Sequence, residues 1–221
     1  MPTVINASTN DGYQASGLST SWDSTHDAVG QLAPDTNNST DGFNGVRYEY
    51  VTGRGAVRYY LVRSFFDFDT SGVNAKPTAA TFNFTASANA SATPVIVAKS
   101  GHDPSTPLDD WFSTWITGQG ITLSGWGLGD VTAYSSATSV ASAGSVTSIE
   151  LTLDAREDML DLSVFKICLL HAEDLLDQAP TSGLQRTGMI WSDNGSSQPN
   201  LSYTPGTAAV TDNATFFGAN F

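Results

Sequence analysis

Residues Ala56–Ser71, with the sequence AVRYYLVRSFFDFDTS, decide the fold class of this chain. Side chains alternate between two faces along a β-strand. Phe66 and Phe68 therefore share one face, and Arg63 and Asp67 share the other. Aromatic and branched residues of this kind suit a packed, pleated surface. We predict a strand whose phenylalanines face the core and whose opposite face is at least partly in contact with water.

Short strands are predicted on both sides of this stretch. Their ranges are Thr3–Ala7, Val46–Thr52, Pro77–Ala86, Val95–Lys99, Val131–Tyr134, Ser145–Leu153, Val164–His171, Thr187–Trp191 and Leu201–Thr204. One short helix is expected from a cap at Asp154 to about Leu160 or Leu162. Residues 13–45 and most of 100–129 carry turn residues and no regular pattern.

Consecutive short strands without helical heptads or a fixed repeat close into a sandwich or jelly roll. The predicted fold is all-β: a jelly-roll-like antiparallel β-sandwich of about nine or ten strands with one short helix. Residues 1–205 are assigned to this domain, and residues 206–221 to an extended C-terminal tail.

The composition limits the classes of function. Charged residues make up 14% of the chain, the net charge is −13 and the pI is near 4.2. Nine Lys and Arg residues cannot neutralise many phosphates, so we expect no nucleic-acid partner. No apolar run is long enough to span a membrane, and no secretory signal precedes the polar N-terminal sequence. We therefore expect synthesis in a cytoplasm and no membrane partner.

The single cysteine, Cys168, excludes an intrachain disulfide and a cysteine-based metal site. Its apolar neighbours predict a buried side chain. No local signature of a hydrolase, a metalloprotease or a nucleotide-binding loop occurs, so no catalytic residue is assigned and a non-enzymatic protein is expected.

Three polar groups have a functional and a structural interpretation. Asp23, His26 and Asp27 suggest either a metal or proton site or a solvated polar loop, and the loop is favoured. His102 is interpreted as part of a turn, and His171 as an outward-pointing strand end.

Calcium requires several converging oxygen ligands. Asp67 with Asp69, and the turn Asp193-Asn194-Gly195, are the candidates, and neither has the spacing of a known calcium loop. We therefore expect no cofactor, with a structural calcium ion as the alternative.

Aromatic side chains offer a possible sugar-binding surface. Trp111, Trp115 and Trp126, together with Trp191, are the candidates for stacking on sugar rings. The competing interpretation is that tryptophans of a β-sandwich belong to its core.

The C-terminal tail is not explained by a monomer. Phe216, Phe217 and Phe221 follow the last predicted strand, and exposed apolar clusters generally contact a partner. We predict that these residues anchor the protein to a partner, the alternative being that the tail folds back on its own sandwich.

Several motifs resemble the DNRLRE-type β-sandwich domains, which are related to carbohydrate-binding modules. They are Arg63–Asp69, Ala80–Phe84, Thr114-Trp115 with Trp126, Asp130–Thr132, and Pro199–Tyr203. The segments Pro2–Ser8, Ser64–Gly72 and Phe165–Cys168 resemble structural proteins of tailed marine bacteriophages that carry this domain.

The resemblance implies a virion structural protein on the particle surface, such as a capsid decoration or cement protein, a head fibre or a tail-associated protein. Its partners would be other virion proteins, including capsid or tail-fibre subunits, and further copies of itself, with a trimer favoured. A carbohydrate-binding module for host or environmental glycans is the alternative. No catalytic residues accompany this resemblance.

Overall fold

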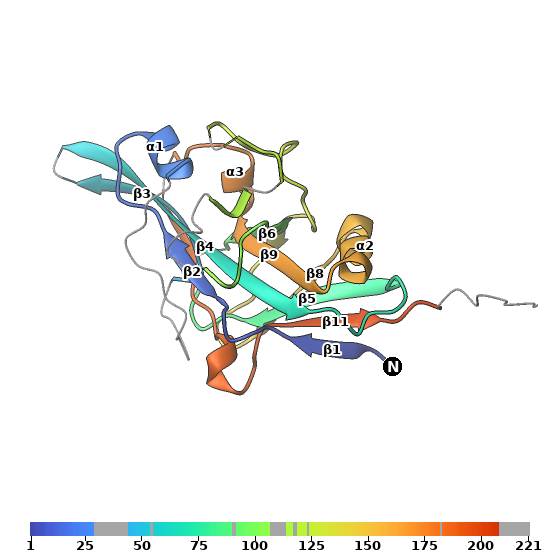
Figure 1. Ribbon diagram of the computed structural model, residues 1–221. Coiled ribbons are helices and arrows are strands. Elements are labelled where there is room, and N and C mark those ends of the chain that lie inside the picture. Colours follow the sequence, from blue (N-terminus) through green and yellow to red (C-terminus); the bar gives the residue numbers. More distant parts are fainter. Residues whose placement is uncertain are drawn as a thin grey trace, which may run out of the picture.

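The chain folds into two antiparallel sheets packed face to face (Figure 1). The computed structural model describes residues 1–28, 44–53, 55–89, 92–106, 114–116, 119–122, 124–181 and 183–207. The smaller sheet has the order β1-β11-β5-β8, and the larger has the order β10-β3-β4-β9-β6-β7, with β2 also paired to β4. This arrangement confirms the predicted all-β sandwich.

The strands of the described residues are short apart from β4. They are β1 Thr3–Asn6, β2 Gly12–Ala15, β3 Val46–Gly53, β4 Ala56–Asp69, β5 Ala79–Thr85, β6 Pro94–Lys99, β7 Thr138–Ser139, β8 Val146–Glu150, β9 Val164–His171, β10 Leu184–Thr187 and β11 Asn200–Thr204. The helices are α1 Trp22–His26, α2 Leu153–Asp161 and α3 Ala172–Leu175, with 3₁₀ turns at Thr114–Ile116 and Ser192–Asn194. Among the described residues, no helix is both long and apolar enough to cross a membrane.

Strand β4 organises the larger sheet. Strand β2 pairs with one of its edges at Val62–Phe65, whereas β3 and β9 follow one another along the other edge, β3 at Ala56–Val62 and β9 at Ser64–Asp69. The outer half of β4 forms a hairpin with β3, which extends beyond the rest of the sandwich (Figure 1).

The core between the sheets confirms the expected inward face of β4. Phe66 and Phe68 have no exposed surface, and the ring centroid of Phe66 lies 5.0 Å from that of Phe82 on the smaller sheet. Burial of each phenylalanine contributes about 2–3 kcal/mol.

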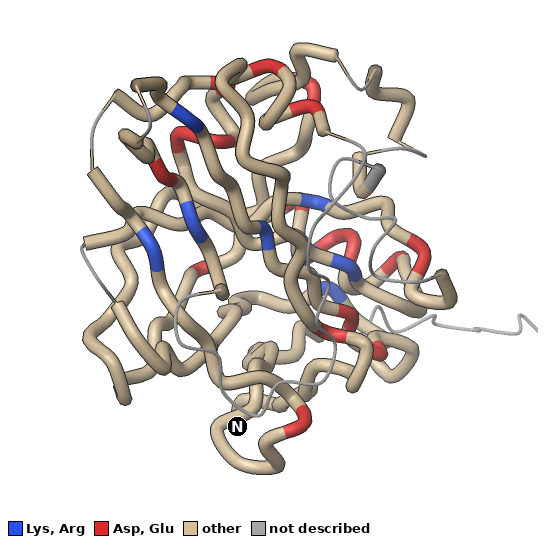
Figure 2. Tube along the Cα trace, turned by 90° about the vertical axis from the view of Figure 1, so that its left-hand side faces the viewer, with Lys and Arg blue, Asp and Glu red and all other residues tan. Residues whose placement is uncertain are grey.

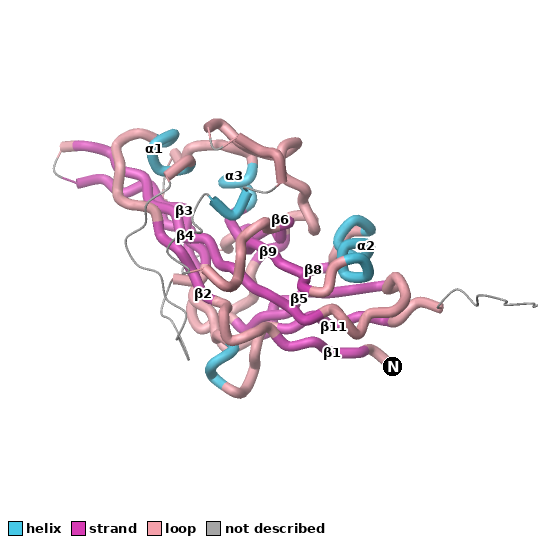
Figure 3. Tube along the Cα trace, viewed as in Figure 1, coloured by secondary structure: helices cyan, strands magenta, loops and turns pink. Residues whose placement is uncertain are grey.

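From Leu61 to Asp67 the opposite face of β4 is also buried, so the prediction of a partly wet face is wrong for Arg63 and Asp67, while Tyr59 on the hairpin half of this face is half-buried. Arg63 and Phe65 have no exposed surface, and Asp67 is 3% exposed. Loop segments and α3 lie over this face of the larger sheet (Figure 3). Trp115, Trp126 and Leu175 form a second apolar cluster with Phe65 there. Strand alternation assigns residues to faces, but it does not reveal what covers each face.

Several predicted boundaries are corrected. Helix α2 is capped by the Thr152 hydroxyl, which accepts a hydrogen bond from Ala155 N, and Asp154 lies inside the first turn. The late strand ends at Thr187, because the chain then turns to place Trp191 in the core. In place of the predicted strand 131–134, Val131 and Ala133 form isolated bridges, and β2, β7, α1 and α3 were not predicted.

Candidate functional site

The predicted anchoring residues Phe216, Phe217 and Phe221 lie outside the described residues, as does Trp111. The other three candidates for sugar binding are buried: Trp115 has no exposed surface, and Trp126 and Trp191 are each 1% exposed. A sugar ring needs an aromatic face that is open to solvent, and the structure leaves none of these three tryptophans such a face.

Trp126 instead packs on a buried ionic network. Its ring lies 4.3 Å from the His26 ring and 4.8 Å from the guanidinium carbon of Arg63. Arg63 donates through Nε and one terminal nitrogen to the two carboxylate oxygens of Asp174, each at 2.8 Å. The same terminal nitrogen donates to the carbonyl oxygen of His26 at 3.1 Å. The network therefore joins α1, β4 and α3.

The balance of charge in this network favours an ionised Asp174. Burial alone would raise the pKa of this carboxyl group, but the Arg63 guanidinium outweighs burial and holds the pKa below its ordinary value. A planar guanidinium that binds a carboxylate through two parallel bonds gives this pair a fixed orientation.

The favoured interpretation of residues 23–27 as a solvated loop is wrong for His26. Its ring is completely buried, with Nδ1 2.7 Å from Asp27 Oδ1 and Nε2 3.1 Å from the carbonyl oxygen of Asp174. Asp27 Oδ2 in turn accepts a hydrogen bond from Gly125 N. Asp23, in contrast, is exposed. His26 thus fixes the loop around residue 125 to α1.

A second polar chain consists of Ser100, His102 and Asp67. Ser100 Oγ lies 2.6 Å from His102 Nδ1, and His102 Nε2 lies 2.5 Å from Asp67 Oδ1. These residue types are those of a nucleophile, a base and an orienting acid. The expectation that His102 belongs to a simple turn therefore missed a buried contact with β4.

The surroundings of these three hydrogen-bonded side chains favour a structural role. Ser100 is 4% exposed and His102 is 2% exposed. The backbone N–H groups that could stabilise an oxyanion are already used: Ser100 N donates to Lys166 O and Gly101 N to Trp115 O. The contact between His102 and Asp67 on β4 holds residues 100–102 against the larger sheet.

The remaining candidates are also engaged by the fold. His171 is buried and stacks on Tyr48 at 4.1 Å, so its predicted outward orientation is wrong. Burial lowers the pKa of His171 and raises the pKa of the Cys168 thiol. The prediction that Cys168 is buried is confirmed.

The calcium candidates lie in two separate places. Asp67 is bound to His102, whereas Asp69 Oδ1 accepts hydrogen bonds from the backbone N–H and the hydroxyl of Ser71. Asp193 lies in the 3₁₀ turn Ser192–Asn194. In the described part of the chain, no three His, Cys, Asp or Glu side chains are grouped to hold a metal ion.

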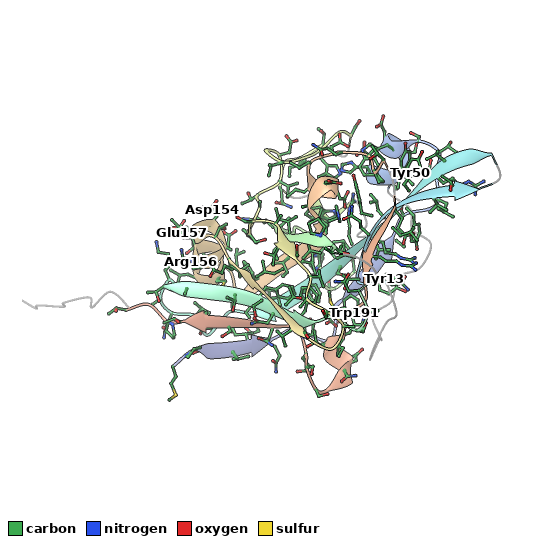
Figure 4. All side chains as sticks on the ribbon, turned by 180° about the vertical axis from the view of Figure 1, so that it is seen from behind. Tyr13, Tyr50, Asp154, Arg156, Glu157 and Trp191 are labelled. Atoms are coloured by element: carbon green, nitrogen blue, oxygen red, sulfur yellow. The ribbon has the colours of Figure 1, made fainter. Side chains whose placement is uncertain are left out.

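Open aromatic surface occurs on the β3–β4 hairpin. Trp22 is half-buried, and its indole N–H donates to Asp177 Oδ1 at 2.7 Å. The rings of Tyr59 and Tyr50 continue this surface, with Trp22–Tyr59 and Tyr59–Tyr50 centroid distances of 5.8 and 6.2 Å. Figure 4 labels Tyr50 on the projecting hairpin, away from Asp154 and Glu157 on α2. The sequence analysis did not select these rings, although Tyr50 and Tyr59 follow the strand alternation.

Comparison with known proteins adds no relative: the chain matches no protein-family model and no curated protein sequence. The resemblance to DNRLRE-type domains therefore stays a prediction.

Proposed function

We propose that this chain is a non-enzymatic structural protein of a bacteriophage particle. In this proposal it is a capsid decoration or cement protein, or a head fibre, displayed on the particle surface and anchored by the segment after the last strand. Other virion proteins are its partners, and it associates with further copies of itself.

The observation that carries the proposal is the point at which the chain leaves the sandwich. Strand β11 pairs with β1 on one side and β5 on the other, and Tyr203 lies opposite Thr3 near the N-terminus. Gly206 then packs closely on the loop between β4 and β5, since a Cβ at this position would lie 2.1 Å from the carbonyl oxygen of Lys76. The terminal segment therefore starts from a fixed point at one end of the smaller sheet.

The chemistry of that segment fits an anchor. Among the described residues, aromatic and aliphatic side chains, Trp191 included, form the core between the sheets. Phe216, Phe217 and Phe221 add three large apolar side chains beyond the last strand. Burial of one phenylalanine in a partner contributes about 2–3 kcal/mol, so three would offset much of the roughly 4–15 kcal/mol that association costs.

The buried polar groups support a structural role more than a catalytic one. Arg63 with Asp174, and His102 with Ser100 and Asp67, bind one another and fasten the loops to the larger sheet. Carbohydrate recognition is the alternative proposal. It would fall to the half-buried rings of Trp22, Tyr50 and Tyr59, because Trp115 and Trp126 are buried.

Deletion of residues 207–221 tests the anchor. The shortened chain should keep its circular dichroism spectrum and melting temperature, because Gly206 and all strands remain. It should be lost from purified particles, as measured by electron microscopy with labelled antibody against the sandwich. A full-length variant with serine at Phe216, Phe217 and Phe221 is the matched control and should also be lost. Normal incorporation of either variant would refute the anchoring role.

A further inference from the structure

The projecting β3–β4 hairpin has two faces of different chemistry. The basic face comprises Arg47, Glu49, Arg58, Tyr60, Leu184 and Arg186. The acidic aromatic face comprises Trp22, Tyr50, Tyr59, Glu173 and Asp177, with Asp23 exposed next to Trp22 on α1. We propose that copies of this chain associate through the hairpin, with the basic face of one copy against the acidic aromatic face of the next. The inference rests on the proposed self-association and assigns its contact surface.

The basic face concentrates arginine in an acidic protein. Arg47 and Arg186 are direct partners across β3 and β10. Like charges in that position are destabilising. Glu49 lies between them, with Oε1 3.3 Å from Arg47 Nε and 3.6 Å from the nearest terminal nitrogen of Arg186. Arg58 adds a third guanidinium to this face, nearer the tip of the hairpin. Figure 2 shows positively charged segments on neighbouring strands at this side of the molecule.

This face is also suited to contact. The guanidinium of Arg47 lies 5.1 Å above the centre of the Tyr60 ring, and Leu184 is 45% exposed. Arg47 and Arg186 keep 18% and 26% of their side-chain surface exposed. The guanidiniums are therefore held in place and still reach solvent at the edge of the face.

The other face offers carboxylates beside aromatic rings. Asp177 accepts a hydrogen bond from the indole N–H of Trp22, and the Trp22 and Tyr59 rings meet edge to face. Asp23 is exposed at the start of α1. Burial raises the pKa of Tyr48, and the charge of the Glu173 carboxylate raises it further. An arginine from outside could stack on these rings and pair with these carboxylates together.

Charge complementarity identifies a second copy as the partner. The chain carries a net charge of −13, so two copies repel each other except where opposite charges meet. Because the two complementary surfaces lie on opposite faces of one hairpin, the contact is heterologous, and repeated contacts close into a ring, such as a trimer, or continue as a filament.

Charge reversal on the full-length chain tests this contact. Arg58→Glu and Asp23→Arg each reverse one exposed or partly exposed charge. Each should weaken association about tenfold or more in sedimentation velocity, because it places like charges together. The double variant reverses both faces and should recover association. Lys76→Glu, which removes an exposed pair with Glu157 elsewhere, is the matched control and should have no effect. Association should weaken as salt is raised.

Three results would overturn the proposal. The first is a wild-type chain that stays monomeric at low salt over the whole concentration range. The second is unchanged association of Arg58→Glu with an unchanged melting temperature. The third is glycan-array binding by a monomer that Tyr50→Ala abolishes, which would assign the aromatic face to sugars. The chain without residues 207–221 should still associate, so failure of the tail anchor and failure of this contact are distinguishable.

Discussion

Asp11 allows the most quantitative test of the structure. Its side chain has no exposed surface, and its carboxylate oxygens accept hydrogen bonds from the backbone N–H and the hydroxyl of Ser192. Burial raises the pKa of Asp11 from 3.8 to about 7, against the lowering effect of the Ser192 hydrogen bonds. The charges of Asp193 and Asp67 add to the rise.

The sign of the pH dependence follows from this raised pKa. Between about pH 4 and pH 7 the unfolded chain is ionised at this position while the folded chain keeps its proton. Stability contributed by the protonated group therefore falls as the pH rises through this interval. At about 1.4 kcal/mol per pH unit, a rise from 3.8 to about 7 corresponds to about 4 kcal/mol. Asp11→Asn keeps the shape without the charge, so it should be more stable than the wild type by up to about this amount at pH 8.

The assay is urea denaturation of both proteins at pH 4, 5.5, 7 and 8, followed by tryptophan fluorescence. The advantage of Asp11→Asn should be small at pH 4 and should grow to its full value by pH 8. Asp103→Asn is the matched control. Asp103 is exposed, and hydrogen bonds from the backbone N–H and the hydroxyl of Ser105 lower its pKa. The ionised Asp103 carboxylate stabilises the folded protein above the pKa that this group has in the unfolded chain, and this stabilisation is lost as the pH falls. Asp103→Asn should therefore not stabilise the protein at pH 8.

A variant Asp11→Asn that is no more stable than the wild type at pH 8 would refute the reasoning. So would an advantage that does not shrink toward pH 4. The first result would mean that Asp11 is ionised in the folded protein and that the Ser192 hydrogen bonds outweigh burial. The second would mean that the gain of stability does not come from the ionisation of Asp11.

Other substitutions test the buried groups by the same denaturation assay. Arg63→Met should cost about 3–5 kcal/mol, because it leaves the Asp174 carboxylate buried without its cation, and adding Asp174→Leu should recover most of the loss. A double variant no more stable than the single one would contradict this account. Phe66→Ala should cost about 3–5 kcal/mol through the cavity left between the sheets, and a loss below about 1 kcal/mol would mean that the core is not packed as described. Ser100→Ala should cost about 1–2 kcal/mol by removing the hydroxyl partner of His102, and an unchanged melting temperature would argue against the fastening role. Cys168 should react with a thiol reagent only after unfolding, because burial raises its pKa and shields it, and rapid labelling of the folded protein would contradict that burial.

The aromatic alternation of β4 was sufficient to predict a strand, its inward face and the sandwich class. Alternation is a local property, because neighbouring side chains on a strand must point to opposite faces. Phe66 and Phe68 were therefore placed correctly from a few residues of sequence. The short helix at residues 153–161 was found for a similar reason, although its cap was assigned to Asp154 instead of Thr152.

The candidate sites depended on contacts between distant residues. Arg63 and Asp174 are separated by 111 positions, and His102 and Asp67 by 35, so no local spacing indicates either pair. The burial of Trp115 and Trp126, which the core interpretation of the tryptophans expected, likewise depends on the loops and helices folded over β4.

By itself the sequence determined the strand pattern, the acidic charge, the buried cysteine and the aromatic residues beyond the last strand. Only the tertiary structure decided that both faces of β4 are covered from Leu61 to Phe68, and that the β3–β4 hairpin presents arginines on one face and carboxylates with aromatic rings on the other. The physical reason is that strand periodicity is fixed by the backbone geometry of adjacent residues. Burial and charge pairing depend on which distant segments the topology brings together.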